Sequence, residues 1–76
     1  MNNKQRKEIE SIRANVEALK DRVQSVLDEE QEKFDNMPEG FQNGERGDKA
    51  QGSIEHLDNA VSFLDDVLSE LESAGE

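Results

Sequence analysis

The residues best suited to bind a ligand lie together near the middle of the chain. Two of the three aromatic residues and three of the nine basic residues fall between positions 33 and 49. A stacking ring, a cation for phosphate and amides for polar edges are what a nucleotide or other small anion requires. The candidate ligand-binding residues are Phe41, Arg46, Lys49, Asn36 and Asn43. The alternative is that Phe34 and Phe41 close the end of a helical bundle, and that the polar residues only keep a connector soluble.

The patterns expected of an enzyme or a metal protein are missing from the sequence. There is one histidine, His56, and no cysteine, which excludes a Cys-ligated metal site and leaves one candidate base for a nucleophile. A di-iron bundle needs a glutamate three residues before the histidine, and position 53 is serine. The acidic run at 28–32 spreads around a helix and does not have the spacing of a calcium loop. We therefore expect no enzymatic activity, no metal and no cofactor.

The charge of the chain points away from direct binding of nucleic acid. The chain has 76 residues, 19 acidic and 9 basic, and a net charge of −10, whereas a nucleic-acid surface is basic. An acidic row at spacing seven, formed by Asp58, Asp65 and Glu72, suggests the reverse role. Such a row could imitate a phosphate track and occupy a basic, nucleic-acid-binding protein. The alternative is a solvated outer helix face.

Two segments must position these residues, and each carries apolar residues at spacings 3, 4, 3, 4 and 3. This spacing is typical of a helix with a coiled-coil seam. The first set is Ile9, Ile12, Val16, Leu19, Val23 and Val26, and the second is Ile54, Leu57, Val61, Leu64, Leu68 and Leu71. We predict one domain, with a helix at about 3–36, a loop at about 37–47 that includes Pro38, and a helix at about 48–74. The second helix begins near Asp48 or near Ser53.

The predicted fold is all-α: an antiparallel two-helix hairpin. Charge segregation supports antiparallel pairing, because residues 1–22 carry a net charge of +2 and residues 23–76 carry −12. The pairing places the bases of the first helix beside the acids at the end of the second. The bases are Lys4, Arg6, Lys7 and Arg13, and the acids are Asp65, Asp66, Glu70 and Glu72.

The apolar content predicts an oligomer. Only 17 of the 76 residues are Leu, Ile, Val or Phe, and two helices leave their seam open on both sides. A homodimer or higher helical bundle would cover it; the alternative is a monomeric hairpin. The expected oligomer interface consists of Ile9, Ile12, Val16, Leu19, Val23, Ile54, Leu57, Val61, Leu64, Leu68 and Leu71.

The sequence also suggests where the protein works. No apolar run approaches the ~20 residues that a membrane helix needs. The first ten residues are mostly polar and charged, unlike a secretory signal. We therefore expect a cytoplasmic protein that does not contact membranes.

The connector resembles a known group of proteins. The run at 29–40, EEQEKFDNMPEG, and the following Glu45-Arg46-Gly47 look like short, acidic, uncharacterised proteins of phages and prophages of Gram-positive bacteria. The resemblance implies a bacteriophage protein that acts in the host cytoplasm against a host defence system. For the mechanism we favour sequestration of a small nucleotide-like signalling ligand by the residues of the connector. The alternatives are inhibition of a basic host protein by nucleic-acid mimicry and a purely structural coiled-coil oligomerisation module.

Overall fold

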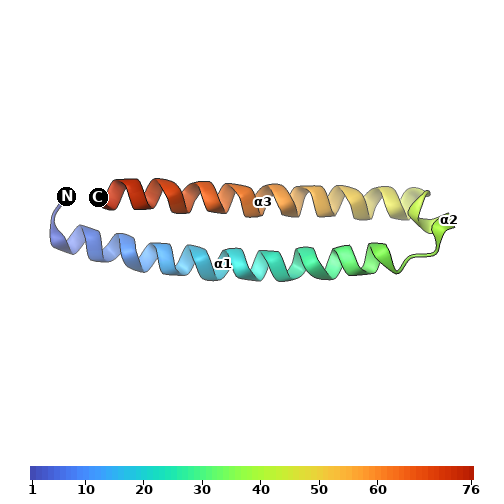
Figure 1. Ribbon diagram of the computed structural model, residues 1–76, viewed down its shortest axis with the longest axis horizontal. Coiled ribbons are helices and arrows are strands. Elements are labelled where there is room, and N and C mark those ends of the chain that lie inside the picture. Colours follow the sequence, from blue (N-terminus) through green and yellow to red (C-terminus); the bar gives the residue numbers. More distant parts are fainter.

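The computed structural model describes all 76 residues as one helical hairpin (Figure 1). It contains α1 (Asn3–Asp35), α2 (Glu39–Gln42) and α3 (Glu45–Gly75). The long helices α1 and α3 run antiparallel side by side, and both chain termini lie at the end opposite α2. The hairpin is a rod of 58 × 14 × 12 Å. The predicted all-α hairpin is therefore confirmed. Neither long helix has an apolar stretch long enough to cross a membrane.

The ends of α1 follow from local side-chain chemistry. The Asn2 side chain accepts a hydrogen bond from the Gln5 backbone N–H at 2.8 Å, and the Gln5 side chain accepts one from the Asn2 backbone N–H at 3.1 Å. This reciprocal capping box satisfies backbone donors that a helix start leaves free. At the other end, α1 stops at Asp35, with Asn36 as its C-cap, because Pro38 cannot continue a helix. The predicted helix at about 3–36 is confirmed within one residue.

The predicted loop at 37–47 is too long, and both proposed starts of the second helix are wrong. The short helix α2 occupies part of this segment, and α3 begins at Glu45 with Gly44 as its extended N-cap. Two acidic residues, Glu45 and Asp48, fall in the first turn of α3, where negative charge is favourable against the helix dipole. Gly52 lies inside α3 because one glycine costs only about 1 kcal/mol of helix stability.

A close approach between α2 and α3 fixes the turn. Gly47 is buried, and a Cβ atom at this position would overlap the backbone carbonyl of Gln42. The Gln42 side chain also donates a hydrogen bond of 3.0 Å to the backbone oxygen of Phe34. Gln42 therefore connects the end of α1 to the start of α3. Glycine is required at position 47 because a larger residue would overlap Gln42, and not because of its backbone conformation, since its φ is not positive.

The apolar seam of α3 agrees with its predicted ladder. All six predicted residues are partly buried, and the same spacing continues toward the turn through Ala50 and Gly47, which are buried. Ala50 of α3 and Leu27 of α1 are the two buried apolar side chains of the hairpin.

The seam of α1 differs from its predicted ladder. The covered residues of α1 are Ile9, Arg13, Val16, Lys20, Val23, Gln24, Leu27, Glu30 and Phe34. Ile12, Leu19 and Val26 lie one position to the side of this row and are exposed. The physical reason is that Leu27 and Phe34, with Arg13 and Lys20 in line with them, form the row that faces α3. Long basic side chains lay their aliphatic stems across a seam while the charged ends reach solvent or acids.

Candidate functional site

The structure brings two of the five predicted ligand-binding residues together. The Arg46 guanidinium carbon lies 5.3 Å from the centre of the Phe41 ring, within the range of a cation–π interaction. Phe41 belongs to α2 and Arg46 to the first turn of α3, so the tight turn places them side by side. The Phe41 side chain remains half-exposed. An aromatic ring and a cation are thus presented to solvent at the turn.

The other three predicted residues do not join this pair. Lys49 lies 3.6 Å from Glu45 in an ion pair within α3. Asn36 and Asn43 are the C-caps of α1 and α2, where their backbone N–H groups bond to helix carbonyls. Asn36 lines a polar groove with Glu29, Glu32 and Lys33, and neither Phe41 nor Arg46 lines any groove. No cavity collects the five residues.

One side of the hairpin, which we call the acidic flank, carries the row Asp58, Asp65 and Glu72 of α3. Lys20 Nζ donates a hydrogen bond of 2.7 Å to Asp65 Oδ1, and Arg13 lies 3.9 Å from Glu72. The hydrogen bond to Asp65 and the charge of that carboxylate raise the pKa of Lys20 above its ordinary value of 10.5. Pairing between the basic start of the chain and the acidic end is confirmed for Arg13, and Lys20 supplies a second pair that the sequence analysis missed.

The opposite side of the hairpin, which we call the apolar flank, carries large apolar side chains. Its large members are Ile12, Leu19 and Val26 of α1 and Phe63 and Val67 of α3, each between 38 and 67 % exposed. Ala60 continues the α3 row toward the turn. Helical spacing of 3, 4 and 7 residues places each set on one face of its helix. The flank therefore exposes apolar side chains of both helices, and polar residues such as Glu30 and Ser53 replace them toward the turn.

Two shallow grooves run along the apolar flank. The first, of about 330 Å³, is lined by Leu19, Arg22, Val23, Val26 and Leu57. The second, of about 750 Å³, is lined by Val26, Glu30, Lys49, Gly52, Ser53, His56 and Leu57. Because both grooves share Val26 and Leu57, they form one furrow between α1 and α3. Leu19 and Val26 of α1 and Ser53 and His56 of α3 line this furrow. Because Ala60 and Phe63 follow Ser53 and His56 by seven residues, the α3 part of the apolar flank faces the same side of the rod.

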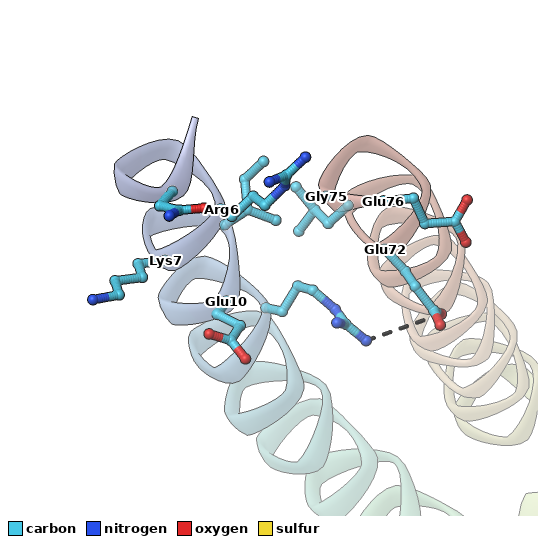
Figure 2. Close-up of a pocket in the computed structure, with 10 residues that line it drawn as sticks. Arg6, Lys7, Glu10, Glu72, Gly75 and Glu76 are labelled. Carbon is cyan, nitrogen blue, oxygen red and sulfur yellow. Dashed lines mark ion pairs between the residues drawn. The ribbon is translucent and has the colours of Figure 1, made fainter. Parts of the chain in front are cut away.

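A third groove lies where the two chain ends meet (Figure 2). Its lining includes Ile9, Leu71 and Gly75, and its volume is about 440 Å³. Three bases and three acids surround it: Arg6, Lys7, Arg13, Glu10, Glu72 and Glu76. Lys7 points away from α3, and Arg13 is engaged with Glu72 (Figure 2). The balanced charges give this groove no preference for a cation or an anion.

The remaining chemistry-bearing residues do not form a site. His56 is exposed on α3. No three His, Asp or Glu side chains converge in a geometry that could hold a metal ion.

Comparison with known proteins finds no matching family model, no matching curated protein and no matching solved structure. The apolar flank is therefore the feature of this chain from which function is best argued. A sequence pattern could have predicted the α3 part of the apolar flank, because Ala60, Val67 and Ala74 repeat every seven residues beside the α3 seam.

Proposed function

We propose that this chain is a non-enzymatic binding module that acts by packing its apolar flank against other helices. The observation that carries the proposal is the single-sided exposure of Ile12, Leu19, Val26, Phe63 and Val67. Contiguous apolar patches of this kind mark interaction sites in soluble proteins. The row of large side chains repeats every seven residues along α1, and this is the pattern that a partner helix recognises.

The small core of the hairpin supports the same proposal. Leu27 and Ala50 are the two buried apolar side chains, and the other seam residues are only partly buried. A domain of this size has little stability to spare. Covering the apolar flank would remove further apolar surface from water at about 25 cal/mol per Å². Binding would therefore stabilise the hairpin as well as form the complex.

A photo-crosslinking experiment tests this proposal. p-Benzoylphenylalanine is placed at Phe63 on the apolar flank or, as a matched control, at Asp58 on the acidic flank, in cells that express the chain. We expect adducts to form from position 63 and not from position 58, and the adduct mass identifies what was bound. Adducts from neither position, or equally from both, would contradict the proposal.

A second candidate function is supported by the Phe41–Arg46 pair. An exposed ring with a guanidinium stacked on it can hold the base and the phosphate of a nucleotide-like ligand. A thermal-shift panel of cyclic nucleotides tests this candidate. A melting temperature that rises with one ligand and fails to rise in Arg46→Ala would support sequestration of that ligand. No rise with any ligand would contradict it.

The contacts of the acidic flank argue against nucleic-acid mimicry. Two of the three carboxylates in the proposed row, those of Asp65 and Glu72, pair with Lys20 and Arg13 of the same chain. Paired carboxylates offer a basic partner less free charge than a phosphate track would. The role against a host defence system stays a prediction. It is compatible with helix binding, and the crosslinked partner would identify it.

A further inference from the structure

We infer that the partner of the apolar flank is a second copy of this chain, related by a two-fold axis that runs along the rod. In this dimer α1 of each copy packs on α3 of the other, and the two turns lie at the same end. The inference rests on the proposed function, because it names the helices that the apolar flank binds. It also assigns the orientation, which the proposed function leaves open.

The level of each residue along the rod follows from the two ion pairs between the helices. We call two residues level when they lie at the same position along the rod axis. Arg13 pairs with Glu72 and Lys20 with Asp65, and because the helices are antiparallel, the numbers of two level residues, one from each helix, add up to 85. By this rule, each large residue in the α1 row of the apolar flank is level, within one residue, with a smaller residue of α3. The pairs are Ile12 with Ala74, Leu19 with Val67, and Val26 with Ala60.

A two-fold axis along the rod keeps every residue at its own level. The large α1 side chains of the first copy therefore lie over the smaller α3 side chains of the second. By symmetry, the large α1 side chains of the second copy lie over the smaller α3 side chains of the first. Alternation of large and small residues across facing positions is what lets helix layers interdigitate. The apolar flank is thus complementary to a second apolar flank, as an isologous interface requires.

The charges at the edges of the apolar flank favour this axis over a perpendicular axis centred on Leu19, the middle of the α1 row. Arg22 is level with Phe63, and Glu29 is level with His56. With the axis along the rod, Arg22 of one copy lies over Phe63 of the other, and Glu29 lies near His56. A perpendicular axis centred on Leu19 places Glu29 beside Glu8 of the other copy instead. The first arrangement forms a cation–π contact and the second a like-charge contact.

The size of the rod is sufficient for such an interface. A stable interface of ordinary size buries about 800 Å² on each partner. A broad side of the rod measures 58 by 14 Å, so two rods packed along their whole length reach an interface of that order, with the apolar flank at its centre. A partner of the same length can therefore cover the flank from end to end.

Sedimentation equilibrium tests the identity of the partner. We expect twice the chain mass of 8.6 kDa for the wild-type protein at 100 µM, which is about a hundred times a Kd of 1 µM. Leu19→Glu should give the single-chain mass with retained helical circular dichroism, because Leu19 lies outside the seam. Gln31→Glu is the matched control. It introduces the same charge on the side of the acidic flank, where Gln31 lies near Asp58, and it should leave the dimer intact. A wild-type mass of one chain, or of more than two, would overturn the inference.

Spin labels test the orientation. The chain has no cysteine, so Glu39→Cys gives one labelling site per chain at the turn. With the axis along the rod, the two labels should lie within about 30 Å, since two helices side by side span roughly 20 Å. A distance near the 58 Å length of the rod would overturn the proposed axis. Adducts from position 63 to a different protein, with no adduct to the chain itself, would overturn the second copy and leave the proposed function standing.

Discussion

The acidic flank and the apolar flank are built by the same two helices, yet they complete their interactions in different ways. On the acidic flank, Lys20 and Arg13 reach across from α1 to carboxylates of α3. On the apolar flank, Leu19 and Val26 of α1 are about half-exposed. The comparison shows that two charge pairs join the helices on one flank, whereas the apolar side chains of the other flank remain exposed.

The difference between the flanks comes from one residue of register in α1. The row Arg13, Lys20 and Leu27 faces the seam, so the row that precedes it by one residue, Ile12, Leu19 and Val26, falls outside. Exposed ion pairs contribute little to stability, whereas apolar groups contribute in proportion to the area that they bury. The hairpin therefore completes weak interactions on one flank, and the stronger apolar ones of the other flank would form only in the proposed dimer.

The largest expected effect concerns the turn, on which both flanks depend. Gly47→Ala puts a methyl group against the backbone of Gln42, and overpacking against backbone costs about 3 kcal/mol. We expect a large fall in the urea midpoint, measured by circular dichroism. Gly52→Ala is the matched control, because nothing lies within 4 Å of a Cβ at that position, and it should stabilise α3 by about 0.5–1 kcal/mol. Equal effects from the two substitutions would mean that α2 does not approach α3 as described.

The second effect separates the seam from the apolar flank. Leu27 is 9 % exposed, so Leu27→Ala should cost about 2–3 kcal/mol at every protein concentration. Leu19→Ala should cost about 1 kcal/mol in dilute protein, because the side chain is already half in water, and more as concentration rises and the flank becomes covered. Urea unfolding at two concentrations measures both. A concentration-independent cost of Leu19→Ala equal to that of Leu27→Ala would place Leu19 in the seam.

The smallest effect concerns the acidic flank at high pH. The pKa of Lys20 is raised in the folded chain above 10.5 by its hydrogen bond to Asp65, so folding favours the protonated amine. This contribution is complete below about pH 10 and is lost as pH rises through the folded pKa. Lys20→Arg keeps its proton and should lose less stability between pH 9 and pH 12, as measured by thermal unfolding. Lys33→Arg, which pairs within α1, is the control and should behave as the wild type does.

Much of the fold could be predicted from spacing and charge. The 3-4 spacing of the two ladders and the break at Pro38 predicted the two helices, because these signals are local. Charge segregation predicted their antiparallel pairing. The start of α3 was missed because Gly44 caps it without a side chain. The register of α1 was missed because two apolar rows overlap there. Packing against α3, at Leu27 and Phe34, determines which of the two rows is buried.

The candidate site was less predictable for a related reason. A sequence shows which residues are near one another along the chain, and this brought Phe41 and Arg46 together correctly. It does not show that Lys49 is engaged with Glu45, or that Asn36 and Asn43 end helices. The apolar flank was visible as a row of spacing seven, but its exposure depends on the register of α1.

The position of both termini at one end of the rod has a mechanical consequence (Figure 1). A force applied between the two chain ends would pull α1 and α3 apart one contact at a time, starting where Gly75 meets Ile9. Such peeling never loads the whole seam at once, unlike shear along the rod, and it begins where helix ends already fray. The hairpin is therefore mechanically soft when its ends are pulled apart. A second rod lying along its side would brace it against peeling.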